Sequence, residues 1–120
     1  MLQKSQNNSF GKNGEEIACD LLTKNGYKII DRNFSSRFGE IDIIAIKDAT
    51  LIFVEVKTRQ SLRFGFPEEA VTSQKIYKIK KTGEYYSLIH PDLPKKLRVD
   101  VVALLIENSK ITYSKIITVD

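Results

Sequence analysis

Apolar residues recur along this chain first at helical and then at strand-like spacing. Ile17, Ala18, Leu21 and Leu22 lie three and four residues apart, which places them on one face of a helix over residues 14–25. Shorter apolar runs follow, each bounded by polar, turn-forming segments, and these indicate strands. The pattern therefore predicts an amphipathic helix followed by a β-rich segment.

A second helix interrupts the strands. Thr72 or Ser73 is a suitable N-cap, and the proline-containing segment 90–94 ends the helix after about Leu88. The predicted strands cover residues 27–34, 41–46, 51–58, 97–106 and 111–119, and residues 59–69 form a loop. The order is αβββαββ, an α/β arrangement. We expect a flexible tail over residues 1–10, which are rich in Gln, Asn, Ser and Lys, and one domain over residues 11–120.

The second and third strands predict a β-hairpin with a definite register. Residues 47–50 between them are short, polar and turn-like. Pairing Ile46 with Leu51 sets Asp42 opposite Glu55 and Glu40 opposite Lys57. Directly opposed residues have Cβ atoms about 4.5–5.5 Å apart, and Glu55 and Lys57 share a face at about 7 Å. Four charged groups then converge on one patch.

Charged residues inside apolar strands need an explanation beyond core packing. Two opposed carboxylates repel each other, so Asp42 and Glu55 require a cation or a shared proton. Because Lys57 already has Glu40 opposite it, an excess of negative charge remains, which suits Mg²⁺ with oxygen ligands. The alternative is an ion-paired hairpin that faces solvent.

These motifs resemble a known group of proteins. Asp42, followed by Glu55-Val56-Lys57, is similar to the catalytic core of the PD-(D/E)xK, or restriction endonuclease-like, superfamily. More closely, the chain resembles the YraN-type family of small bacterial proteins. The matching blocks are residues 11–18, 26–27, 32–34, 39–42, 53–59, 64–65, 70–75 and 98–102. The resemblance implies an αβββαβ core with a central mixed sheet flanked by helices, here with an extra C-terminal strand.

The resemblance also implies a function, metal-dependent hydrolysis of phosphodiester bonds. Asp42, Glu55 and the backbone carbonyl of Val56 would hold Mg²⁺, for which Mn²⁺ could substitute, and Lys57 would act on the water or the phosphate. Helical geometry directs Glu15 toward the sheet and Glu16 away from it. In the superfamily an acidic residue of the first helix often completes the metal site, so Glu15 joins the candidate catalytic residues. A favourable charge in the first helical turn is the simpler role for Glu15.

Basic residues indicate a nucleic-acid partner, with DNA as the expected one. The formal net charge is +4, and Arg59 and Arg63 follow the proposed site. Lys75, Lys78 and Lys81 recur at three-residue spacing and would form a stripe on the second helix. The stripe could equally be a solvated helix face. Arg98 and Asp100 share a strand face and are expected to form a structural pair.

Composition sets the remaining expectations. One cysteine excludes an internal disulfide, and no run of about 18 apolar residues predicts a membrane span. We therefore expect a cytoplasmic protein that does not bind a membrane. Its core is also similar to that of archaeal Holliday-junction resolvases, which implies a branched or structured DNA substrate and a homodimer. Two alternatives to a nuclease stay open, namely a nucleic-acid-binding module that cuts little or not at all and a domain that docks a basic protein.

Overall fold

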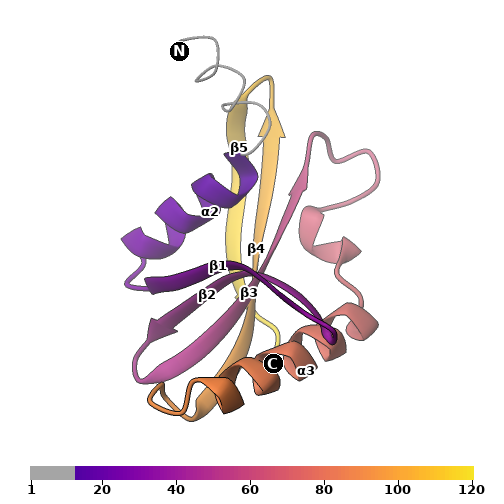
Figure 1. Ribbon diagram of the computed structural model, residues 1–120. Helices are drawn as coiled ribbons and strands as arrows, with labels where there is room; N and C mark the ends of the chain where they lie inside the picture. Colours follow the sequence, from indigo (N-terminus) through magenta and orange to yellow (C-terminus); the bar gives the residue numbers. More distant parts are fainter. Residues whose placement is uncertain (1–12) are drawn as a thin grey trace, which may run out of the picture.

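The computed structural model describes residues 13–120 and follows the predicted order of elements (Figure 1). The elements are α2 (Asn13–Lys24), β1 (Lys28–Ser36), β2 (Gly39–Lys47), β3 (Thr50–Arg59), the 3₁₀ helix η1 (Pro67–Ala70), α3 (Ser73–Ile89), β4 (Lys96–Glu107) and β5 (Lys110–Thr118). The short helix η1 lies in the segment predicted as a loop. The tail expected over residues 1–10 lies outside the described residues.

The strands form one mixed five-stranded sheet in the order β1-β2-β3-β4-β5. Within residues 13–120, β3 and β4 run parallel, with α3 as the crossover between them, and the other neighbouring strands are antiparallel. Helices α2 and α3 lie on opposite sides of the sheet (Figure 1). This is the predicted mixed α/β fold, consistent with a restriction endonuclease-like core to which β5 adds a strand.

Each face of the sheet has its own apolar core. On one face Ala18 and Leu22 of α2 pack with side chains that include Ile43 and Val54. On the other face Ile79 and Tyr86 of α3 pack with residues that include Phe53. Strand β3 therefore alternates between the two cores, as a strand covered on both sides must. A Cβ at Gly83 of α3 would lie 2.4 Å from the Phe53 ring, so the absence of a side chain lets α3 approach the sheet.

Local chemistry explains where α3 and the hairpin begin and end. The Thr72 side chain accepts a hydrogen bond from the Lys75 amide and caps α3, as predicted. Asp48 and Ala49 both have positive φ angles, 50° and 57°, which matches the two-residue turn that joins twisted antiparallel strands. Ile46 pairs with Leu51, so the predicted hairpin register is correct at the turn.

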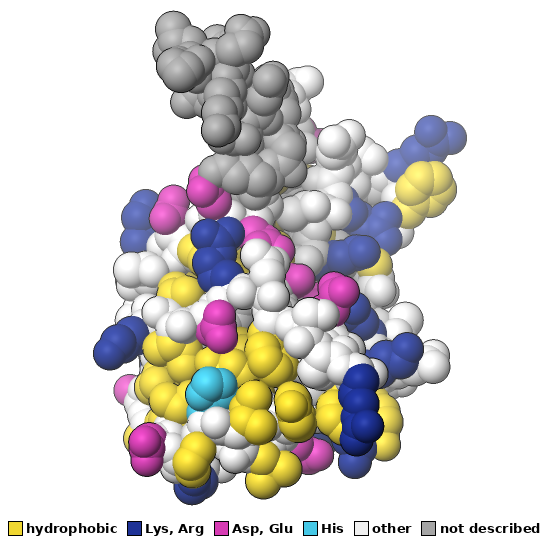
Figure 2. Space-filling model, in the orientation of Figure 1, with side chains coloured by type: hydrophobic (Ala, Val, Ile, Leu, Met, Phe, Trp, Pro, Cys, Tyr) yellow, Lys and Arg dark blue, Asp and Glu magenta, His cyan; other side chains and the backbone are white. Residues whose placement is uncertain are grey.

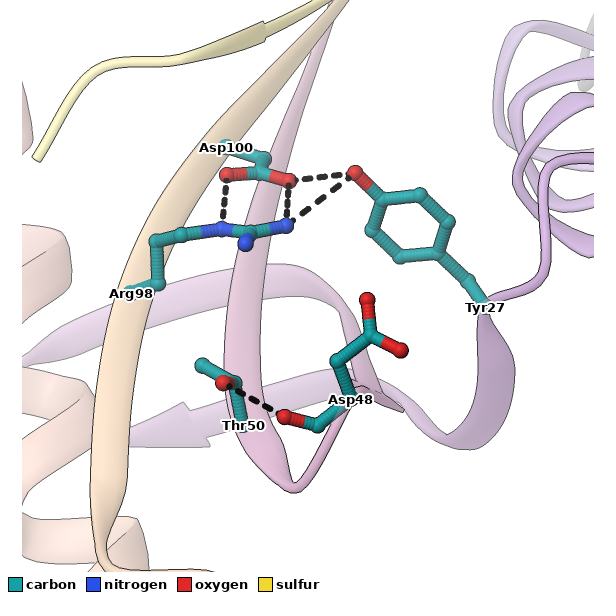
Figure 3. Close-up of polar contacts among 5 residues, drawn as sticks. All are labelled: Tyr27, Asp48, Thr50, Arg98 and Asp100. Carbon is teal, nitrogen blue, oxygen red and sulfur yellow. Dashed lines mark hydrogen bonds and ion pairs between the residues drawn. The ribbon is translucent and has the colours of Figure 1, made fainter.

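A buried polar cluster ties the start of β1 to β4 (Figure 3). Asp100 is fully buried, and its two oxygens accept hydrogen bonds from Arg98 Nε and Nη2, both at 2.9 Å. The Tyr27 hydroxyl donates to Asp100 Oδ2 at 2.6 Å. Burial and the hydrogen bond to Asp100 raise the pKa of Tyr27 to about 12, which keeps its hydroxyl a donor. The predicted Arg98–Asp100 pair is thus confirmed.

Apolar side chains also reach the surface at the C-terminal end of α3. Figure 2 shows a hydrophobic area around the chain's single histidine, His90. The imidazole of His90 lies against the Tyr86 ring, with centroids 4.2 Å apart, and Leu88 and Ile89 are exposed beside it. No helix within residues 13–120 is long and apolar enough to cross a membrane.

Candidate metal and nucleic-acid site

Asp42 lies where strands β2 and β3 separate. The backbone pairing between them ends at the pair Ile43–Val54. Beyond this pair, a side chain replaces the backbone acceptor, because Asp42 Oδ2 accepts a hydrogen bond from the Val56 amide at 2.8 Å. The predicted backbone pairing of Asp42 with Glu55 is therefore replaced by a side-chain bridge. The second predicted pairing, Glu40 with Lys57, is wrong, because the two strands have already separated there.

A local change in strand direction accounts for this separation. Ile41 packs in the core under α3, whereas Ile43 packs in the core under α2, although residues two apart normally share a face. Asn33 lies across from Asp42 on β1, between the pairs Arg32–Ile43 and Phe34–Ile41, and has a φ of 54°. Asn is among the residues that best tolerate this left-handed conformation. The twist turns Asp42 toward the gap between β2 and β3.

Glu55 and Lys57 share the face of β3 that α3 covers. Strand β3 pairs with β4 without interruption from Thr50 to Arg59, so Glu55 and Lys57 continue the alternation of Phe53, which packs in the core under α3. Both side chains are half-buried. The sequence prediction that they share one face is confirmed, and the face is the one beside the N-terminal part of α3.

The electrostatics of Glu55 show that two carboxyl groups lie close together. Burial raises the pKa of Glu55 to about 7, and the charge of Asp42 and a hydrogen bond between the two carboxyls add to the shift. Lys75 and Lys57 act in the opposite direction. Near neutral pH Glu55 is therefore about half protonated, and a divalent cation bound beside it would take the place of that proton.

Glu15 faces the sheet, as predicted, but other side chains hold it there. Arg32 Nη2 lies 3.4 Å from Glu15 Oε1, and the Asn33 amide, in the orientation that satisfies its hydrogen bonds, donates to both Glu15 oxygens at 3.0 and 3.1 Å. Glu15 and Asp42 line one hollow of about 530 Å³, together with residues that include Val56 and Thr58. Glu15 thus shares a cavity with Asp42 but has an ion-pair partner of its own.

The donor set fits a magnesium ion that takes few of its ligands from the protein and the rest from water. Asp42 Oδ2 accepts a hydrogen bond from the Val56 amide, and the Asp42 carboxyl also interacts with the Glu55 carboxyl. Within residues 13–120 no three acidic, histidine or cysteine side chains come together as a ligand group. Mg²⁺ commonly binds through one or two carboxylates and keeps several waters. Two carboxylates and a carbonyl would therefore suffice for it, and the metal-related role of Glu15 stays a prediction.

The candidate phosphate-binding residues lie on three successive elements. Arg59 ends β3, half-buried, and its Nε is enclosed with no hydrogen-bond partner. Arg63 lies in the following loop, 5.4 Å from the centroid of the Phe64 ring. Lys75, Lys78 and Lys81 are exposed on α3, and Lys75 acts on the pKa of Glu55. Lys81 also forms a 3.9 Å ion pair with Glu84, so the far end of the stripe is partly neutralised.

Sequence reasoning assigned no role to Arg32 and Asn33. Both side chains position Glu15, and Asn33 also marks the twist that presents Asp42. A polar Asn between the charged Arg32 and the apolar Phe34 in a strand pattern was a signal for an irregularity. Its partner could not be read from sequence, because α2 packs against β1 only in the folded chain.

Comparison with known proteins assigns the chain to a family. The model of "Uncharacterised protein family UPF0102" matches residues 14–104. A UPF0102 protein of Syntrophomonas wolfei is 47% identical over 111 residues, which cover 92% of this chain and 96% of that protein. One from Caldicellulosiruptor bescii is 51% identical over 98 residues, or 81% and 82% of the two chains. The matched range includes Glu15, Asp42, Glu55 and Lys57, and the protein is therefore a member of the UPF0102 family.

Proposed function

We propose that this protein is a metal-dependent nuclease that hydrolyses phosphodiester bonds in nucleic acid, with DNA as the expected substrate. The observation that carries the proposal is the pair of adjoining carboxyls, Asp42 and Glu55, with Lys57 and Lys75 near them. Repulsion within such a pair is a cost to the fold that structural packing does not explain. A cation bound between the carboxyls would remove it.

The residues around the pair have distinct roles in this proposal. Asp42, Glu55 and the Val56 carbonyl hold Mg²⁺ or Mn²⁺, which when bound polarises phosphate oxygens and makes a nearby water more acidic. The Lys57 ammonium orients the attacking water or stabilises charge that develops on the phosphate. The twist at Asn33 and the hydrogen bond from Val56 fix Asp42 in place before any ligand arrives.

Basic residues would supply the binding energy for the nucleic-acid strand. Arg59, Arg63 and Lys75 lie on the elements that follow or adjoin the carboxyl pair, where their charges can contact phosphates next to the bond that breaks. Glu15, held by Arg32 and Asn33, supports the wall of the cavity beside Asp42. The cytoplasmic location and the homodimer stay predictions.

The second candidate is a nucleic-acid-binding protein of the same fold that cuts slowly or not at all. The engagement of Glu15 by Arg32 and Asn33 favours it, because a nuclease that needs a third carboxylate on its metal would lack one here. This candidate predicts nucleic-acid affinity that does not depend on Asp42, and no cleavage with Mg²⁺ or Mn²⁺.

Cleavage assays decide between the two. The protein is incubated with Mg²⁺ or Mn²⁺ and a labelled nucleic acid. The substrates are single-stranded, duplex, flap and four-way-junction DNA, and RNA of matched sequence. We expect metal-dependent products that Asp42→Asn, Glu55→Gln and Lys57→Ala each abolish, while Lys57→Ala still binds metal. Asp92→Asn removes a carboxylate from the exposed loop before β4 and serves as the matched control. Equal cleavage by Asp42→Asn and the unmodified protein would eliminate the proposed metal site.

A further inference from the structure

The loop between β3 and α3 contains a tight turn with a large apolar side chain at its tip. The Gly65 amide donates to the Leu62 carbonyl at 3.0 Å, which closes a four-residue turn. Arg63 and Phe64 occupy the two central positions. Phe64 is 74% exposed, although burying a phenylalanine is normally favourable.

Contacts of the residues that follow this turn hold it in place. Glu69 Oε1 accepts a hydrogen bond from the Phe66 amide at 3.0 Å, and the Phe66 ring packs 5.0 Å from the ring of Tyr113 on β5. Gly65 has a φ of 101°, and a Cβ there would collide with the Glu69 carboxylate. Phe64 is therefore presented by an anchored turn, and its exposure is a property of the folded loop.

A positive charge lies beside the exposed ring. The Arg63 guanidinium lies 5.4 Å from the Phe64 centroid, and Arg59 ends the strand that leads into the loop. Figures 1 and 2 show this loop protruding beside the end of β3, with hydrophobic and basic surface adjoining on it. Glu55 lies four residues before Arg59, about 13 Å at roughly 3.3 Å per strand residue. A nucleic-acid strand a few nucleotides long can span the distance from the carboxyl pair to Arg59, from which the chain continues into the turn.

We propose that Phe64 is a stacking platform for an unpaired base, so that the substrate of the proposed nuclease is single-stranded or locally unpaired nucleic acid. This inference rests on the proposed function, because it takes nucleic acid as the ligand. An exposed aromatic ring with an arginine beside it provides what a single strand needs, stacking for a base and positive charge for the adjoining phosphates. In an intact duplex both faces of an interior base are already stacked, and Phe64 gains nothing there.

The chain contains no tryptophan, which makes Phe64→Trp a selective reporter. The indole keeps the stacking face, and its fluorescence is quenched when a base stacks on it. Leu88→Trp on α3, where the native side chain is 79% exposed, is the matched control. Both variants are titrated with oligothymidylate and with a blunt duplex in EDTA, so that the readout does not require cleavage. We expect oligothymidylate to quench Phe64→Trp strongly, the duplex to quench it weakly, and neither to quench Leu88→Trp.

Affinity provides the second readout. Phe64→Ala should weaken binding of oligothymidylate by about 5- to 150-fold, the range for the loss of one base–aromatic stack, and Phe64→Trp should restore it. The proposal is wrong if oligothymidylate does not quench Phe64→Trp, or if it quenches both reporters equally. It is also wrong if Phe64→Ala binds the single strand as tightly as the unmodified protein, or if the protein does not bind oligothymidylate. Failure of the nuclease proposal looks different, since metal-dependent cleavage would then be absent while the Phe64 readouts in EDTA stay as expected.

Discussion

Asp42 combines two roles at the level of a single residue. Its Oδ2 replaces a missing backbone partner of the Val56 amide, and its charge raises the pKa of the adjoining Glu55. The first role needs only a hydrogen-bond acceptor, which asparagine keeps. The second needs the negative charge, which asparagine lacks, so that substitutions can separate the two.

We predict that Asp42→Asn stabilises the metal-free protein near pH 7, because it removes a charge that opposes ionisation of Glu55. The gain should be about 1 kcal/mol, the scale of one pKa unit, since the half-buried pair is partly screened by solvent. Thermal melting in EDTA measures it. The same variant should lose the stabilisation that Mg²⁺ or Mn²⁺ gives the unmodified protein.

Asp42→Ala is the control for this measurement. It removes the charge and also the acceptor of the Val56 amide, so it should be less stable than Asp42→Asn. If Asp42→Asn itself melts at a lower temperature than the unmodified protein in EDTA, the carboxylate is a structural partner of the amide, and the ion-paired hairpin becomes the better interpretation.

The raised pKa of Glu55 predicts in which direction the free energy of unfolding changes with pH. Its pKa in the folded protein is about 7 against 4.5 when unperturbed, so between these values the folded state binds more protons than the unfolded state. The free energy of unfolding must then fall as pH rises from about 4.5 to about 7. Glu55→Gln removes this contribution. Urea unfolding in EDTA at pH 5, 6, 7 and 8 should show Glu55→Gln gaining stability relative to the unmodified protein up to about pH 7, and a constant difference would contradict the shift.

At the level of elements, α3 places a basic stripe next to the carboxyl pair. Lys75, near the Thr72 cap, is close enough to lower the pKa of Glu55, and Lys78 and Lys81 follow along the exposed side. The packing of Ile79 and Tyr86 on the sheet fixes which side of the helix is exposed. The stripe predicted from spacing is therefore present, and its binding role stays a prediction.

We predict that reversing Lys75, Lys78 and Lys81 to Glu weakens nucleic-acid binding and flattens its salt dependence. Each lost phosphate contact should reduce the slope of log affinity against log salt by about 0.7 for a single strand and about 0.9 for duplex DNA. Fluorescence anisotropy across a salt series measures both. Reversing Lys24, Lys28 and Lys96 changes the net charge equally, but Lys28 and Lys96 pair with the strand ends near the β2–β3 turn, away from Arg59. Equal effects of the two triple variants would mean that net charge alone acts.

At the level of the whole molecule, the Tyr27–Asp100–Arg98 cluster connects segments far apart in sequence. Asp100 is fully buried on a central strand, where an ionised carboxylate is stable only with partners. Arg98 supplies two hydrogen bonds and Tyr27 a third. The cluster therefore stabilises the packing of α2 and β1 against β4 (Figure 3).

We predict that breaking this cluster destabilises the fold without changing the chemistry of the carboxyl pair. Arg98→Ala leaves a buried charge without its ion-pair partner and should cost about 3–5 kcal/mol. Tyr27→Phe removes one hydrogen bond to a charged group and should cost about 1–3 kcal/mol. Urea unfolding measures both. Asp92→Ala in the exposed loop is the control and should be near neutral, and a neutral Tyr27→Phe would contradict the stabilising role.

Local patterning determined most of the architecture. Apolar periodicity and turn chemistry act over a few residues, and they are enough to predict the order of elements. They also predict the cap at Thr72, the pairing of Ile46 with Leu51 and the shared face of Glu55 and Lys57. Family resemblance in sequence also pointed to the membership that the comparisons show. These features need no knowledge of how distant segments pack.

Only the tertiary structure decided how the site is assembled. A regular ladder would continue past Ile43, and periodicity alone cannot reveal that the left-handed conformation of Asn33 turns Asp42 into the gap where it accepts the Val56 amide. The engagement of Glu15 by Arg32 and Asn33 depends on α2 docking against β1. The display of Phe64 depends on Phe66 packing on Tyr113, a residue of the last strand. Each is a contact between segments distant in the chain, which local sequence preferences cannot specify.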